Sequence, residues 1–324
     1  MKVAVVGAGA IGALVGACLA RGGTDTHLIA RGVHLEALRR DGVRVTGAIG
    51  DFRVNAHATG DPADVGAVDV VFLGLKAYAY ADAAPLIAPL LGPDTAVVAA
   101  QNGIPWWYFH GHGGPYDGRR LESVDPGGAV SAAIPPERAI GCVVYPAAEL
   151  AAPGVVRHIE GTRLSLGEPG RGSSDRCRRL ADALKAGGLK GRVADDLRGE
   201  IWLKLLGNAT FNPLSALTGA TMAQLSQFAP TRSLIAEMMR EIATVAEAVG
   251  QTPSVSIEQR LAGAAAVGEH KTSMLQDFEA GKRLELDVLT GAVLEIGELA
   301  GVALPAVSAV HASVALAERV RDGG

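Results

Sequence analysis

The sequence predicts an α/β protein in two parts, a doubly wound parallel sheet followed by an all-helical domain. Three observations lead to this prediction. A short apolar run, Lys2–Val6, is followed at once by a glycine-rich segment and a helical pattern. Further apolar runs alternate with helical segments as far as residue 195, and from Leu197 onward only helical periodicity remains. We therefore expect domains that span residues 1–195 and 196–324.

The bulk properties limit the class of protein. The chain has 324 residues, enough for two domains, because single cores rarely grow beyond about 250–300 residues. The net charge of −4 and the absence of a basic cluster argue against nucleic acid or an anionic membrane as partner. Three scattered cysteines, Cys18, Cys142 and Cys177, are typical of a reducing, cytoplasmic compartment. The apolar N-terminus lacks the basic start of a signal peptide, and no run reaches the roughly 18–20 apolar residues of a membrane span.

A glycine fingerprint directly follows the first predicted strand. Its positions are Gly7, Ala8, Gly9, Ala10, Ile11 and Gly12. In a dinucleotide-binding fold Gly7 allows a tight turn, Gly9 lets the backbone approach a pyrophosphate, and Gly12 lets helix and strand pack closely. The following helix, Ala13–Arg21, offers N–H groups and a partial positive charge at its N-terminus. This context favours a Rossmann-type nucleotide site over a chance glycine-rich turn.

The end of the second predicted strand, Thr26–Ala30, bears on cofactor choice. Folds that prefer NAD usually carry Asp or Glu about 20 residues after the fingerprint, where the carboxylate binds the ribose 2′-hydroxyl. This chain has Arg31 there instead, and a guanidinium suits the 2′-phosphate of NADP. The sequence therefore favours NADP(H), and a solvated surface arginine is the alternative.

Two nearly continuous apolar runs, Val68–Leu75 and Thr95–Ala100, predict central parallel strands that are covered on both faces. Lys76 follows the first run, and Asn102 follows the second. Ligands of open α/β sheets bind beyond the carboxyl ends of strands, so both are candidate site residues by position. The alternative is that both are ordinary loop residues.

The rest of the first domain begins with an irregular segment, 106–130, that is first aromatic and then rich in glycine. His110 and His112 have no acidic or cysteine partner at ligand spacing, so we predict loop histidines and no metal site. Strands and one helix that complete the sheet are predicted at Gly141–Ala148, Gly154–Glu160, Thr162–Glu168, Asp175–Ala186 (the helix) and Gly191–Asp195.

A polar stripe marks the predicted helix that leads into Pro213. Lys204, Asn208 and Asn212 recur every four residues in an otherwise apolar segment. Each step of four rotates about 40° around a helix, so the three side chains share one face. Buried polar groups need partners. Only seven of the thirty basic residues are lysines, so a lysine at position 204 indicates a need for a titratable charge, which arginine cannot supply. The alternative is a lysine whose side chain extends along the helix to the surface.

A second polar pair lies downstream. Ser273 precedes a helix that is predicted from near Arg283 to Ala300, and Glu285 falls in the first turn of that helix. A first-turn glutamate is often a capping or dipole residue, and the spacing alone favours that interpretation.

The ordered motifs GAGAIG, LKAY, QNGIP, EIWLKLLGNATFNP and TSMLQD…LELD resemble the 2-dehydropantoate 2-reductase (ketopantoate reductase) family, from residue 1 to about residue 310. The resemblance implies a 6-phosphogluconate-dehydrogenase-like fold and NADPH-dependent reduction of ketopantoate to pantoate, in pantothenate and coenzyme A biosynthesis. It implies Lys204 as the catalytic acid, and it implies that substrate is bound by Asn208, Asn212, Ser273 and Glu285. It implies that NADPH is bound by the glycine fingerprint and by Arg31, Lys76, Asn102, Ala147 and the same Glu285.

Two departures from the family pattern bear on substrate choice. The segment 106–130 is longer than the short helix typical of the family, and Thr221-Met222 stands where some members carry an asparagine. One alternative is a reductase of another small 2-keto acid. Another is a reductase of a sugar phosphate, whose site would need more basic residues near the helix that carries Lys204. A non-catalytic NADP(H) sensor is a further alternative, but it would not need Lys204. A homodimer is compatible with the resemblance.

Overall fold

The computed structural model describes residues 1–170, 172–266 and 268–324. These residues form two compact units, and the predicted fold class, a Rossmann-type α/β part followed by a helical part, is confirmed. The sheet unit comprises Met1–Gln101, Trp106–Arg120 and Gly127–Leu197, and the helical unit comprises Asn102–Pro105, Leu121–Pro126 and Arg198–Gly324. Two short segments from the first half of the sequence therefore belong to the helical unit.

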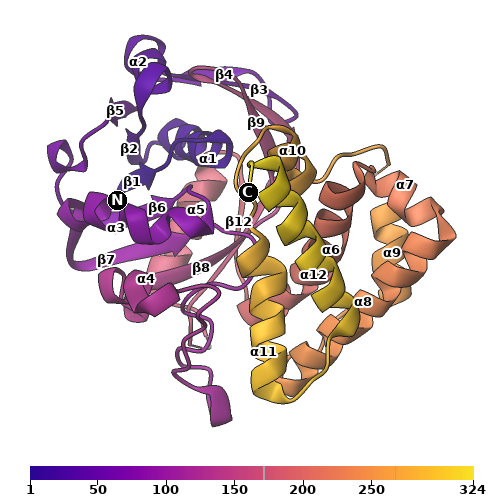
Figure 1. Cartoon of the computed structure of the whole chain (residues 1–324). Helices are drawn as coiled ribbons and strands as arrows, with labels where there is room; N and C mark the ends of the chain where they lie inside the picture. The colour runs from indigo at the N-terminus through magenta and orange to yellow at the C-terminus, as the bar shows by residue number, and fades with distance from the viewer. Residues whose placement is uncertain (171, 267) are drawn as a thin grey trace. The chain divides into compact units, whose positions relative to one another are not determined.

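An eight-stranded sheet forms the centre of the sheet unit (Figure 1). Its strands in spatial order are β12 (Lys190–Val193), β11 (Arg163–Gly167), β8 (Ala139–Val144), β7 (Leu91–Ala99), β6 (Val68–Leu73), β1 (Lys2–Val6), β2 (Asp25–Ile29) and β5 (His57–Thr59). Neighbouring strands are parallel except β11 and β8. The chain order reverses at β1, which pairs with β2 on one side and β6 on the other. Such a reversal is where open α/β sheets bind ligands.

Helices cover both faces of this sheet. The crossovers β1–α1–β2 and β6–α3–β7 run in opposite directions along the sheet, so right-handed connections place α1 (Ala10–Arg21) and α3 (Tyr80–Ile87) on opposite faces. The helix α5 (Asp175–Ala186) packs beside α1. Their approach is close at Gly187, where a Cβ atom would lie 1.9 Å from the carbonyl oxygen of Cys18.

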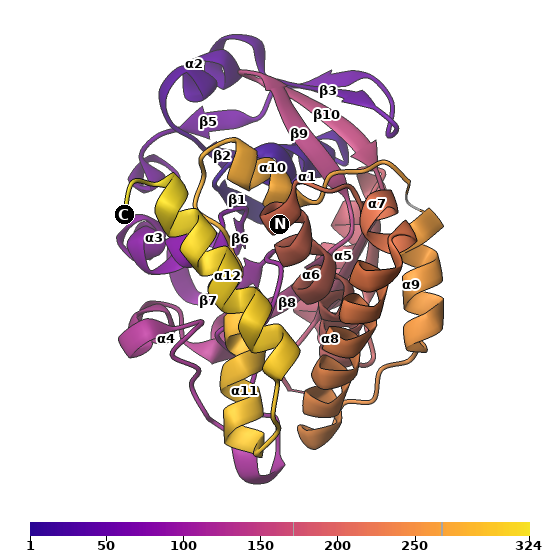
Figure 2. The ribbon, with the colours of Figure 1, turned by 45° about the vertical axis from the view of Figure 1, so that its right-hand side comes forward.

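A second sheet of four strands packs on the other side of α1 (Figure 2). Its order is β4 (Phe52–Val54), β3 (Val43–Gly47), β10 (Val155–Glu160) and β9 (Ala147–Ala152). The prediction that residues 141–148 and 154–160 complete the main sheet was therefore wrong in part. The strand β8 ends before Pro146, which has no N–H to continue the ladder. The chain then leaves the main sheet, and Ala147 opens β9 instead of ending a strand of the main sheet.

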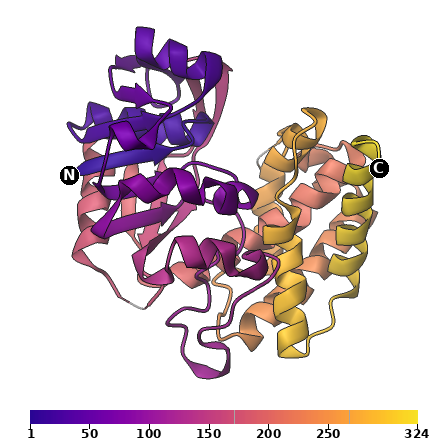
Figure 3. The same ribbon diagram turned by 60° about the vertical axis from the view of Figure 1, so that its left-hand side comes forward.

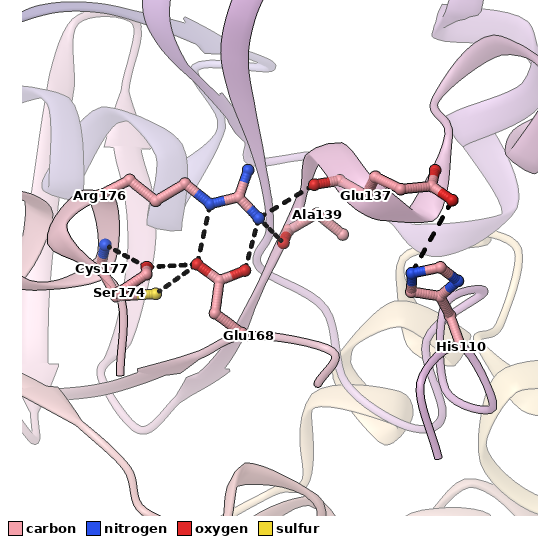
Figure 4. Close-up of polar contacts among 7 residues, drawn as sticks. All are labelled: His110, Glu137, Ala139, Glu168, Ser174, Arg176 and Cys177. Carbon is pink, nitrogen blue, oxygen red and sulfur yellow. Dashed lines mark hydrogen bonds and ion pairs between the residues drawn. The ribbon is translucent and has the colours of Figure 1, made fainter. Parts of the chain in front are cut away.

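An ion pair ties β11 to α5 and β8 (Figure 4). Arg176 at the start of α5 donates from Nε to Glu168 at 2.8 Å, and its Nη2 also donates to the carbonyl oxygens of Glu137 and Ala139. Ser174 donates to the same carboxylate. Burial of Glu168 opposes its ionisation, but these bonds outweigh it and hold the pKa of the carboxyl below its usual value.

Every described residue after β12 lies outside strands, as the sequence predicts, and Figure 3 shows helices throughout this part. The helices are α6 (Leu197–Thr218), α7 (Met222–Gln227), α8 (Ala229–Ala248), α9 (Ile257–Ala266), α10 (Ser273–Glu279), α11 (Ala292–Ala300) and α12 (Pro305–Arg321). The helix α8 contacts α7, α9, α11 and α12. Its buried Glu241 accepts the backbone N–H groups of Ala306 and Val307 at the start of α12, where a negative charge is favourable.

Two helices differ from their expected limits. The helix α6 does not end near Pro213 but continues through it to Thr218. An interior proline costs a helix about 3 kcal/mol, so burial of the neighbouring Phe211 and Leu214 must offset that loss. The helix expected from near Arg283 begins only at residue 286, with a π-helical turn before α11.

The segment 106–130 is divided between the sheet unit and the helical unit. Its aromatic beginning, Trp106–Phe109, is buried in the sheet unit. A Cβ atom on Gly141 in β8 would lie 2.3 Å from the ring of Trp107, so the absence of a side chain there admits the indole. Further along, Glu295 of α11 accepts the backbone N–H groups of Glu122 and Ser123 at 2.7 and 2.9 Å, which attaches that part of the loop to the helical unit.

Candidate active site

The glycine fingerprint forms the turn between β1 and α1. Gly7 has φ +85°, a region that favours glycine. A Cβ atom on Gly12 would lie 2.1 Å from the carbonyl oxygen of Gly7, so helix and strand could not approach this closely with a side chain there. The fold itself therefore requires glycine at both positions.

Gly9 is different, because a Cβ atom there would meet nothing within 4 Å. Gly9 is the N-cap of α1, and no described side chain caps this helix end. The first helical bond runs from Ala13 N to Gly9 O, so the N–H groups of Ala10, Ile11 and Gly12 have no acceptor within the helix. An open surface with several backbone donors at a positive helix end fits an anionic group such as a pyrophosphate.

Arg31 lies close to this turn in sequence and topology. The backbone N–H groups of Gly7 and Ala8 both donate to Ile29 O at 3.2 Å, which attaches the turn to the end of β2. Arg31 follows β2 and is the N-cap of α2 (Gly32–Asp41). Its side chain is exposed and makes no ion pair with any part of the chain that the structure describes. An exposed cation without a carboxylate partner fits a phosphate group.

Lys76 follows β6, the other neighbour of β1. It is half-buried and is the N-cap of a short 3₁₀ helix, Ala77–Ala79. Lys76 and the glycine turn therefore follow the carboxyl ends of two adjacent parallel strands, at the same edge of the sheet. Ala147 comes three residues after the end of β8 and is the first residue of β9, an edge strand of the second sheet.

The polar stripe of α6 is formed as its spacing predicts. In the helical unit, Lys204 Nζ donates to Asn102 Oδ1 at 2.8 Å. Asn208 Nδ2 donates to the same oxygen at 3.4 Å, so Lys204 and Asn208 do share a face. The side chains of these three residues are half-buried, and Asn212, one turn farther on, is buried. Asn102 thus joins the stripe from outside α6.

The two downstream candidates occupy unlike environments. Ser273 is exposed at the first position of α10, whereas Glu285 is only 8% exposed. Glu285 directly precedes a helix and is not in its first turn, which corrects the expectation. Leu284 N donates to Glu318 Oε1 at 2.6 Å, and this tertiary bond holds the segment before the helix.

The histidines of the 106–130 segment are placed in the sheet unit. His110 Nε2 lies 3.8 Å from Glu137 Oε1, and both side chains are exposed to solvent (Figure 4). His112 Nδ1 lies 2.9 Å from the carbonyl oxygen of Gly113. Within the described residues, no three His, Cys, Asp or Glu side chains are grouped so that they could hold a metal ion.

His34, which no sequence motif indicated, contacts the glycine turn. Its Nε2 lies 2.7 Å from Ala8 O, and its Nδ1 accepts Gly154 N–H at 3.0 Å. A histidine on the surface of a helix has no sequence pattern that would reveal such contacts, because Gly154 is 120 residues away.

Comparison with known proteins decides the family. A 2-dehydropantoate 2-reductase from Mesorhizobium japonicum is 48% identical over 315 residues, which cover 97% of each chain. Residues 3–107 match the family described as ketopantoate reductase PanE/ApbA, and residues 196–318 match its C-terminal domain. The chain belongs to the ketopantoate reductase family. It is therefore an oxidoreductase.

Solved structures agree with this membership in the family. A protein from Ralstonia solanacearum MolK2 that is described as a ketopantoate reductase is 39% identical, with a TM-score of 0.93 over 99% of this chain and 98% of the other. The 2-dehydropantoate 2-reductase of Geobacter metallireducens GS-15 is 30% identical, with a TM-score of 0.86 over 98% and 100% of the two chains. Across the described part of this chain, no helix has the length and apolar character needed to cross a membrane.

Proposed function

We propose that this chain reduces 2-dehydropantoate (ketopantoate) to pantoate with NADPH. The observation that carries the proposal is the polar stripe of the helical unit, where Lys204 is hydrogen-bonded to Asn102 and shares a face with Asn208. The names of the relatives support this choice of substrate.

The sheet unit would hold the cofactor through backbone N–H groups and through two cationic side chains, those of Arg31 and Lys76. The N–H groups at the start of α1 would bind the pyrophosphate, and Arg31 would bind the 2′-phosphate that distinguishes NADPH from NADH. By the family resemblance, Lys76, Asn102 and Ala147 would contact the nicotinamide half. When bound, NADPH supplies a hydride to the ketone carbon of the substrate.

Lys204 would supply the proton. Negative charge grows on the ketone oxygen as its carbon is reduced, and an ammonium aimed at that oxygen stabilises the charge and donates a proton. The Oδ1 atom of Asn102 only accepts hydrogen bonds, so its contact with Nζ restricts where the amino group of Lys204 points.

The substrate would be held by neutral groups. Asn208, Asn212 and Ser273 offer amide and hydroxyl donors and acceptors, which suit the carboxylate and hydroxyl of a small branched hydroxy acid. A site that pairs with a substrate hydroxyl rejects analogues without one, because the buried polar group is then left unsatisfied. Glu285 would bind the substrate hydroxyl or the cofactor ribose.

The test is NADPH oxidation measured with a panel of 2-keto acids. We expect kcat/KM for ketopantoate to exceed that for ketoisovalerate, which lacks the hydroxyl, by at least about tenfold. In the variant Asn212→Ala this gap should narrow. Preference for another 2-keto acid would assign the chain to the alternative reductase activity. NADPH binding without turnover of any keto acid would support the sensor alternative and overturn the proposal.

A further inference from the structure

His34 connects two parts of the sheet unit that are distant in sequence. It lies half-buried in the first turn of α2. Its Nε2 is 2.7 Å from the carbonyl oxygen of Ala8 in the glycine turn, and its Nδ1 is 3.0 Å from the backbone nitrogen of Gly154. Gly154 lies in the turn between β9 and β10, so the second sheet holds one side of the imidazole and the glycine turn meets the other.

The two backbone partners determine the protonation of the ring. Gly154 N–H can only donate, so Nδ1 must carry a lone pair. The carbonyl oxygen of Ala8 can only accept, so Nε2 must carry the hydrogen. The contacts together require the neutral Nε2–H tautomer.

The bond to Ala8 also orients the next peptide N–H. A peptide unit is planar and trans, so its C=O and N–H groups point in opposite directions. With the carbonyl of Ala8 directed at His34, the N–H of Gly9 points away from His34. This N–H has no acceptor within the described residues, whereas the N–H groups of Gly7 and Ala8 are both bonded to Ile29 O. Gly9 is thus the first unused donor of the turn, and the space around its Cα is open.

We propose that His34 is a positioning residue for the dinucleotide, which holds the Ala8–Gly9 peptide so that Gly9 N–H is directed at the pyrophosphate. The inference rests on the proposed function, since it requires a dinucleotide at this turn. The second sheet then has a role in cofactor binding without touching the cofactor. Its Gly154 turn packs against α2, where a Cβ atom on Gly154 would lie 3.2 Å from Ala37 Cβ, and so holds the imidazole in place.

Two substitutions separate the two bonds of His34. The variant His34→Gln places an amide N–H near the position of Nε2 and keeps the donor to Ala8. The variant His34→Asn places an acceptor near the position of Nδ1 and keeps only the bond to Gly154. A single hydrogen bond contributes about 0.5–1.5 kcal/mol, so we expect His34→Asn to raise the Kd and KM for NADPH by about two- to tenfold. Val33→Ala, in the same turn but 68% exposed, is the matched control.

The expected pattern has a readout that a purely structural role would not produce. Both variants should keep kcat at saturating NADPH, and His34→Gln should keep the Kd for NADPH close to that of the wild type. In the protein without cofactor, ¹⁵N NMR of His34 should show the neutral Nε2–H tautomer. Equal losses of affinity in both variants, or the Nδ1–H tautomer, would overturn the inference.

The design also separates this inference from the proposed function. If the wild type binds NADPH and His34→Asn binds it equally well, the inference fails and the proposed function stands. If the wild type does not bind NADPH, both fail. Should His34→Asn unfold, His34→Gln and the tautomer measurement still decide the matter.

Discussion

The glycine turn of the sheet unit and the polar stripe of the helical unit present their functional groups in opposite ways. The turn offers backbone N–H groups on an open surface, and the fold requires glycine at Gly7 and Gly12. The stripe offers side chains, Lys204 and Asn208, from the interior of α6, where backbone N–H and C=O groups bond to one another along the helix.

This difference predicts how each region responds to substitution. Side chains of the stripe can be removed without disturbing the path of α6, so their loss should affect chemistry more than stability. In the turn, an added methyl group affects either packing or ligand approach, depending on which glycine receives it.

The largest effect is expected for Lys204→Ala. Loss of a general acid usually lowers the rate by about 10²–10⁴-fold, so kcat with ketopantoate should fall by at least about two orders of magnitude. The melting temperature and the Kd for NADPH should stay near the wild-type values. Lys185→Ala, which removes an exposed lysine of α5, is the control. Near-normal turnover in Lys204→Ala would show that Lys204 has no catalytic role and is an ordinary surface lysine.

The next effect distinguishes two glycines of one turn. In Gly9→Ala the methyl group meets no protein atom, so stability should be unchanged while the KM for NADPH rises by about tenfold or more, since bonds to charged groups contribute about 1.5–3 kcal/mol. In Gly12→Ala the clash with Gly7 O should reduce the free energy of unfolding by about 1–3 kcal/mol. Denaturant unfolding and steady-state kinetics measure both. Equal destabilisation by the two changes would refute the distinction.

A smaller and more selective effect is expected for Arg31→Ala. The KM for NADPH should rise by about tenfold, as for the loss of one charge-assisted bond, while the KM for NADH stays nearly constant. Arg40→Ala, an exposed arginine of the same helix that pairs with Asp41, is the matched control. Equal changes for both cofactors would show that Arg31 does not recognise the 2′-phosphate.

The smallest effect concerns the cysteines, all three of which lie in the sheet unit. Burial raises the pKa of Cys18 to about 12 and that of Cys177 to about 11, from an ordinary value of 9.0. Their stabilising contribution is therefore complete below pH 9 and is lost as the pH rises toward 11–12, because the unfolded chain releases these protons first. Urea unfolding at pH 8 and 10 should show this decline, and Cys18→Ala should lessen it.

The same thiols report on the sheet unit alone. At pH 8 a thiol reagent should label the native protein slowly, and NADPH should slow the labelling further because a ligand stabilises the folded state that binds it. The helical unit contains no cysteine, so its local opening would not be detected. Labelling rates that do not respond to NADPH would argue against a cofactor site in the sheet unit.

Features that depend on local periodicity can be predicted from the order of residues alone. The first strand, the glycine turn and the first helix follow one another directly between Lys2 and Arg21, so their order can be predicted from local sequence patterns. The shared face of Lys204 and Asn208 follows from helical geometry, and the change from mixed to purely helical structure follows from the apolar pattern. The family motifs extended this to the substrate and cofactor residues, whose roles stay predictions.

The contacts between segments that are distant in sequence became known only from the folded structure. It placed Asn102 beside Lys204, 102 residues away, and it joined His34 to the turn at Gly154. It also placed the predicted strand 154–160, and the last two residues of the predicted strand 141–148, in a second sheet, and it buried the aromatic beginning of the 106–130 segment. The physical reason is that such contacts depend on which surfaces meet after the chain has folded, and neither composition nor spacing along the chain specifies that pairing.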